Sequence, residues 1–234
     1  MIVGTAVCPH PPLLLRELTG TQDVAAPLRE ACHGALAHLT EAAPDRVVVV
    51  GGAGTTAEHT DAPVPVRAHG GHGGHGGRVR PDEALPLSLG VARRLLDETG
   101  CALPVELRSV AHDAGEAEIA ALAGQIAGRQ ERVGLLIMGD GSARRSAKAP
   151  GHLDERAFAF DDTVHRALAE GDTGALAGLD PALAEELMVA GRAAWQVMAA
   201  AVDLEGAAVR TEVRYADDPF GVQYLVGVWT CVSS

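Results

Sequence analysis

His10 lies in a proline-rich segment, Pro9–Pro12, that directly follows an apolar run at the start of the chain. Prolines on both sides fix the local backbone and remove amide donors, which holds the imidazole in place. At the carboxyl end of a strand, a histidine can bind a metal, transfer a proton or bind a ligand. A loop histidine that only packs would carry the same pattern, so this segment alone leaves both interpretations open.

His112 follows a second apolar run, Val105–Val110, and precedes Asp113. The carboxylate of Asp113 could orient the neighbouring imidazole, as carboxylates do at many metal and catalytic sites. We therefore treat His112 as a candidate catalytic residue.

A glycine-rich turn, Gly139-Asp140-Gly141-Ser142, comes after a third apolar run and is followed by Arg144, Arg145 and Lys148. Such a turn lets the backbone approach a ligand closely and could offer free amides to an anion. We predict that the turn and Arg144 bind a substrate and that Arg145 has a catalytic role. A tight turn with solvated cations is the alternative.

Three further histidines, His69, His72 and His75, alternate with glycine pairs. Histidine-rich tracts can bind divalent metals, but ordering so many glycines is costly in entropy. We expect residues 54–83 to form a mobile loop that binds nickel or zinc adventitiously and could cover the site as a lid.

Strand-like and helix-like segments alternate along the chain, which predicts one domain, over residues 1–234, built as a three-layer α/β/α sandwich around a mixed, mostly parallel sheet. The expected strands are 1–7, 46–50, 105–110, 133–138, 209–215 and 222–228, and the expected helices are 23–39, 86–98, 115–128, 153–168 and 181–202. The glycines at 51 and 52 should end the second strand.

The composition restricts the class of protein. The formal charge of −12 argues against nucleic acid or an anionic membrane as partner. No apolar run is long enough to span a membrane, and the amino terminus lacks the basic start of a signal peptide, so we expect a cytoplasmic location. The four cysteines are scattered and form no Cys-x-x-Cys pair, which indicates reduced, mostly buried thiols.

Taken in order, several of these segments resemble the class III extradiol ring-cleavage dioxygenases, typified by the catalytic subunit of protocatechuate 4,5-dioxygenase. The similar segments are His10-Pro11, Pro44–Val50, Gly139–Ser142, Leu153–Asp161 and Pro219–Val222. Each is short, and their order and spacing carry the resemblance.

The resemblance implies a non-haem Fe(II) held by two histidines and one carboxylate, with open positions for a catecholate and O₂. His10 matches the first iron ligand, and His112 matches, loosely, a histidine near the substrate. A further histidine of the family acts as acid and base during ring opening.

The other family positions have lost the required side chains. The second histidine is expected at residues 51–53, which are Gly, Gly and Ala. The carboxylate is expected shortly before Trp195, where Gly191 and Arg192 stand, and the acid/base histidine is replaced by Arg145. His59 folding back as a metal ligand, with Glu185 or Glu186, could rebuild the set.

Two functions remain open at this point. The first is a non-catalytic member of the fold that binds a small aromatic or anionic ligand, or pairs as a homodimer or with a related catalytic subunit. The second is an active Fe(II)-dependent extradiol dioxygenase that cleaves a catechol or aminophenol with a rearranged ligand set. The substitutions favour the first, because a single imidazole holds Fe(II) poorly.

Overall fold

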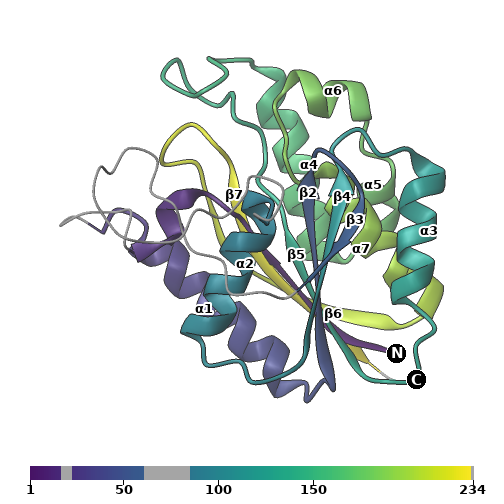
Figure 1. Ribbon diagram of the computed structural model, residues 1–234. Coiled ribbons are helices and arrows are strands. Elements are labelled where there is room, and N and C mark those ends of the chain that lie inside the picture. The colour runs from purple at the N-terminus through teal and green to yellow at the C-terminus, as the bar shows by residue number, and fades with distance from the viewer. Residues whose placement is uncertain (17–22, 61–84, 233–234) are drawn as a thin grey trace.

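The computed structural model describes residues 1–16, 23–60 and 85–232 and forms one seven-stranded sheet with the order β3-β4-β2-β5-β1-β7-β6 (Figure 1). Four neighbouring strands of the sheet are parallel, and three strands at its two sides pair in antiparallel fashion. The parallel strands are β1 (Ile2–Cys8), β2 (Arg46–Ala53), β4 (Val105–Ala111) and β5 (Val133–Met138), and the others are β3 (Ala57–His59), β6 (Ala208–Asp217) and β7 (Tyr224–Val232).

Helices cover both faces of the sheet, which confirms the predicted α/β/α sandwich (Figure 1). One face carries α1 (Ala26–Glu41) and α2 (Leu87–Glu98), with the short 3₁₀ helix η1 (Pro12–Leu14). The other carries α3 (Glu116–Ile126), α4 (Arg156–Glu170), α5 (Thr173–Ala177), α6 (Pro181–Glu186) and α7 (Arg192–Glu205). None of the helices in these described ranges is long and apolar enough to cross a membrane.

The valine run of β2 explains why the sheet needs a helical layer on each side. Val47 and Val49 pack into the core beneath α1 and α2, whereas Val48 and Val50 pack into the core beneath α3 and α7. Successive side chains of a strand point to opposite faces, so a strand of valines alone is stable only when both faces are covered.

Four local predictions were wrong. β2 continues through Gly51 and Gly52 instead of ending there, and the expected helix 181–202 is divided into α6 and α7. The division follows from Met188, whose φ of 56° cannot continue a helix. The short elements β3 and α5 were not predicted; α5 begins at Asp172, whose side chain accepts from the amide of Ala175.

Candidate functional site

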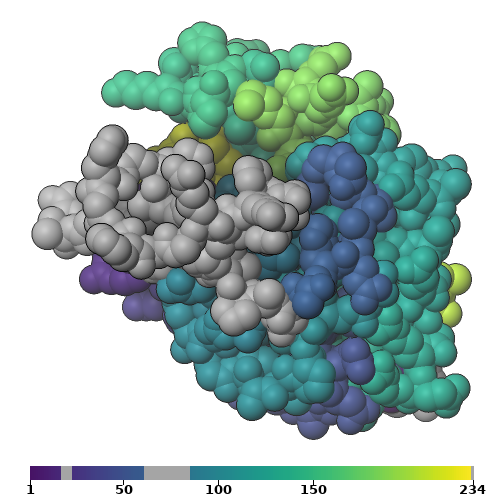
Figure 2. Space-filling model, viewed as in Figure 1, coloured from purple at the N-terminus to yellow at the C-terminus, as the bar shows by residue number. Residues whose placement is uncertain are grey.

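His10 and His112 lie at the same edge of the sheet. They follow the carboxyl ends of β1 and β4, and β2 and β5 end between them in the strand order. Parallel strands bring their carboxyl ends together, and open α/β sheets bind ligands at this edge. In Figure 2 the segment after β5 (green) lies above β2 and β3 (blue) on this side of the molecule.

Asp140 holds His10 in position. The amide nitrogen of His10 donates to Asp140 Oδ1 over 2.7 Å, and its ring Nδ1 lies 3.5 Å from the same oxygen. The backbone oxygen of Asp140 accepts from the amide of Gly191, just before α7. One aspartate therefore connects the ends of β1 and β5 with the start of α7.

The ring nitrogen Nδ1 of His10 is buried and has no hydrogen-bond partner among the described residues. The distance to Asp140 is too long for a good hydrogen bond. A buried polar atom without a partner is uncommon and is often found at functional sites. This atom is the strongest local sign that the edge binds something.

His112 is held by its backbone and lies near other charged groups. Its amide donates to the Ala53 oxygen over 3.0 Å, and its own backbone oxygen accepts from the Arg192 guanidinium. Burial lowers the pKa of the His112 imidazole, His10 and Arg192 lower it further, and Asp113 acts in the opposite direction. The ring is therefore predominantly neutral at neutral pH.

Two of the three positions at the end of β2 where a second metal-binding histidine is expected, Gly51 and Gly52, have no space for a Cβ atom. A Cβ at Gly51 would lie 2.5 Å from Ser88 Oγ. A Cβ at Gly52 would lie 2.7 Å from both the Ala190 oxygen and His112 Cε1. Real Cβ atoms do not approach so closely, so the glycines are required where α2, His112 and the segment before α7 pack against the strand.

Arg192 occupies the part of α7 where the resemblance expects a carboxylate. Its side chain is buried and donates to the backbone oxygens of Ala114 and His112 and to Gln196 Oε1. A permanent cation therefore lies beside His112 and joins the start of α7 to the end of β4.

Three of the four backbone amides of the glycine-rich turn donate to acceptors within the protein, and that of Asp140 has no acceptor among the described residues. Gly139 donates to the Cys8 oxygen, Gly141 to the Gln223 oxygen and Ser142 to Asp161 Oδ1. All three amides are thus committed to protein acceptors. The turn acts mainly as a junction between β5, β7 and α4.

Asp161 is a buried residue of this region that the sequence did not single out. It accepts from the amide and the hydroxyl of Ser142 and from Arg145 Nη1, which lies 3.2 Å from Oδ2. Burial raises the pKa of Asp161, while its hydrogen bonds and Arg145 oppose that shift. Only its position in the segment Leu153–Asp161 could have pointed to it.

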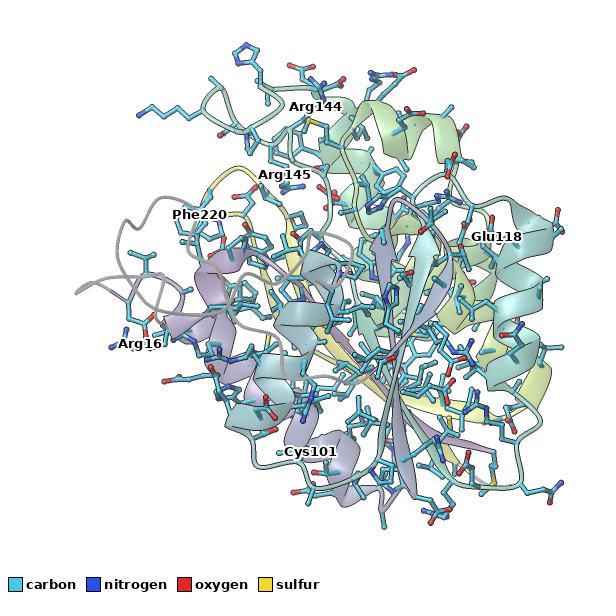
Figure 3. The ribbon with its side chains drawn as sticks, viewed as in Figure 1. Arg16, Cys101, Glu118, Arg144, Arg145 and Phe220 are labelled. Atoms are coloured by element: carbon cyan, nitrogen blue, oxygen red, sulfur yellow. The ribbon has the colours of Figure 1, made fainter. Side chains whose placement is uncertain are left out.

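Arg145 is neutralised by two carboxylates. Its Nε lies 2.5 Å from Asp218 Oδ2, its Nη1 contacts Asp161, and its guanidinium stacks 4.6 Å from the ring centre of Phe158. Figure 3 shows Arg145 near Phe220 of the β6–β7 loop, in agreement with the hydrogen bond from its amide to Gly221. Half of the residues that line the adjacent cavity of about 280 Å³ are aspartates. These contacts hold Arg145 in place, and its catalytic role stays a prediction.

Arg144 and His59 are also placed away from a shared site with His10. Arg144 donates to the Gly151 oxygen and orders the loop before α4. His59 lies on the edge strand β3 opposite Leu107, and its Nε2 lies 2.9 Å from Ser109 Oγ. Three strands separate β3 from β1, a distance of about 19 Å. The predicted ligand pair of His10 and His59 is therefore not brought together.

The described side chains do not fit a two-histidine, one-carboxylate iron centre. They contain no group of three or more His, Cys, Asp or Glu residues placed to hold a metal ion. Glu186 points to Arg156 Nη1, at 2.7 Å, instead of toward His10. The histidine tract at 69–75 lies outside the described residues.

Comparison with known proteins gives structural similarity alone. No protein-family model matches the chain, and no curated protein matches it. Among solved structures, it is similar to an uncharacterized protein, JW3007, from Escherichia coli K12, with a TM-score of 0.52 and 13% sequence identity. The match covers 97% of this chain and 99% of that chain. The similarity shows the fold. It extends over nearly the whole α/β sandwich and carries no information on the reaction.

Proposed function

We propose that this protein is a non-catalytic member of the class III extradiol dioxygenase-like fold that binds a small anionic aromatic ligand, without iron, at the carboxyl edge of the sheet. The contacts would come from His10 and His112, which the fold brings to one edge. A cytoplasmic location is part of this proposal.

The closed end of β2 carries the proposal. The place of the second iron ligand is filled by Ser88 beside Gly51 and by His112 beside Gly52. The packing of the edge therefore disfavours a ligating side chain at these two positions.

The charges favour an anion over a metal dication. The Arg192 guanidinium contacts the backbone oxygen of His112, and its charge opposes a second cation close by. The neutral His112 ring can still donate one hydrogen bond to a carboxylate or a phenolate. Aromatic acids and catechols combine such groups with an apolar ring.

The active dioxygenase remains a second candidate because of one observation, the unpartnered Nδ1 of His10. A metal ligand would have such a free nitrogen before the metal binds. This candidate requires further ligands from outside the described residues.

The test is a calorimetric titration in the presence of EDTA with 3,4-dihydroxybenzoate, benzoate and catechol as probes. We expect 3,4-dihydroxybenzoate to bind with a Kd below about 1 mM and the His112→Ala variant to bind at least about tenfold more weakly. His165→Ala, on the exposed side of α4, is the matched control and should bind as the wild type does. Absence of binding by all three probes, or equal binding by His112→Ala, would overturn the proposal.

A further inference from the structure

β6 forms a long open edge of the sheet. It is ten residues long and pairs on one side with β7, whereas the opposite edge strand, β3, has three residues. On the outer side, no backbone or side-chain group of the described residues bonds to the backbone of β6. Open edges of this length readily pair with another strand.

The hydrogen-bond alternation identifies which groups of β6 face outward. The Gly139 amide donates to the backbone oxygen of Cys8, so the backbone N–H and C=O groups of Cys8 face β5. Those of the preceding residue, Val7, therefore face β7, where the partner of Val7 is Gly227. The next residue of β7, Val228, then faces β6, where its partner is Glu212.

By the same alternation, the backbone N–H and C=O groups of Arg210 and Glu212 face inward, toward β7. The alternation leaves the amides and carbonyls of Val209, Thr211 and Val213 directed outward. These three residues are β-branched, as strand-forming residues usually are.

The side chains of Arg210 and Glu212 are exposed on one face of this edge. Glu212 lies 3.1 Å from Arg214, whereas Arg210 makes no ion pair within the described residues. On the opposite face, the hydroxyl of Thr211 donates to the Ala169 oxygen at the end of α4. The edge therefore presents Arg210 and Glu212 two residues apart, and Glu212 is also paired with Arg214 of the same strand.

We propose that a second copy of this chain pairs with β6 in antiparallel fashion, about a twofold axis at Thr211. The outward backbone groups of Val209, Thr211 and Val213 then bond to those of Val213, Thr211 and Val209 of the second copy. This register places Arg210 of each copy opposite Glu212 of the other copy. Both pairs are of the close, non-hydrogen-bonded type.

Neighbouring registers are disfavoured by charge. An axis at Arg210 places two arginines directly opposite each other, and an axis at Glu212 places two glutamates opposite each other. The register irregularity between Val213 and Tyr215 ends the regular strand just after the proposed paired run. The geometry thus selects one symmetric pairing, which would join two sheets into one.

The experiment is sedimentation velocity of the full chain at about 1–100 µM. We expect the wild type to dimerise. Arg210→Glu and Glu212→Arg, tested separately, should each raise the dimer dissociation constant about tenfold or more, because each places like charges opposite each other. An equimolar mixture of these two variants should form a heterodimer, because each cross-strand pair would then join a glutamate of one variant to an arginine of the other. Arg166→Glu, an exposed reversal on α4, is the control and should leave the dimer unchanged.

A wild type that stays monomeric throughout this range would overturn the proposal. A dimer that Arg210→Glu does not weaken, or variants that fail to pair when mixed, would also overturn it. Circular dichroism of each variant separates loss of pairing from loss of folding. Because the test contains no ligand, its outcome is independent of the binding function proposed above.

Discussion

Gly52 is the residue at which three parts of the carboxyl edge meet. The α-carbon of this glycine faces the ring of His112 on one side and the backbone before α7 on the other. At this scale the strand end is closely packed and leaves no space for a side chain at Gly52. The packing, in turn, fixes the position of His112.

We predict that Gly52→Ala destabilises the protein by about 1–3 kcal/mol, because the new methyl group must displace the Ala190 oxygen or His112. Urea denaturation measures the change, and the NMR shifts of the His112 ring report its displacement. Gly54→Ala is the matched control, since a Cβ at Gly54 meets no atom within 4 Å. Equal stability of the two variants would show that the end of β2 is loosely packed.

Among the elements, β4 is anchored by a group of charges far from the site. Glu106 accepts from Arg129 over 2.8 and 2.9 Å and from Arg108 over 2.8 Å. These hydrogen bonds lower the pKa of Glu106 to about 2, against an ordinary value of 4.5. They connect β4, which ends just before His112, to the segment after α3.

The lowered pKa implies stability that depends on pH. The contribution of Glu106 is fully present above pH 4.5 and is lost as the pH falls toward about 2, because the folded state resists protonation. We predict that Glu106→Gln lowers the unfolding free energy at pH 7 by about 1–2 kcal/mol. The difference from the wild type should shrink to a small residual at pH 2. The exposed Glu118→Gln is the control; a difference between wild type and Glu106→Gln that is constant with pH would contradict the prediction.

The elements also show what sequence can and cannot predict. The strands at Val47–Val50 and Val133–Met138 were predicted correctly, because a strand that is buried on both faces consists of consecutive apolar residues. The break before α7 was missed because it depends on Ala190 and Gly191 fitting against β2 and β5, which are distant in sequence. Contacts of this kind leave no local pattern.

The same reason explains why the sequence could not show the partners of the site residues. His10 and His112 each follow a parallel strand, and parallel strands place their carboxyl ends at one edge of the sheet. The sequence could therefore predict that the two histidines share this edge. The roles of the Gly139–Ser142 amides and of Arg145 depended on acceptors at Gln223, Asp161 and Asp218. A glycine-rich turn followed by arginines looks the same in sequence whether those acceptors are present or absent.

At the scale of the whole molecule, the chain keeps the sheet and both helical layers of its structural neighbour over nearly its full length. The parallel strands still direct two histidines to one edge. The described part of that edge contains a guanidinium and two tightly packed glycines in addition to the histidines. From this edge we infer the iron-independent ligand binding that is proposed above.

The most direct test of this inference is an anaerobic titration with Fe(II) in which binding is measured by calorimetry. The His69, His72 and His75 tract should be changed to serine in all samples, so that adventitious binding there is removed. We predict no stoichiometric binding with a Kd below about 10 µM, and the same weak signal from His10→Ala. Tight binding of one Fe(II) per chain that disappears in His10→Ala would contradict the account and would favour an active dioxygenase.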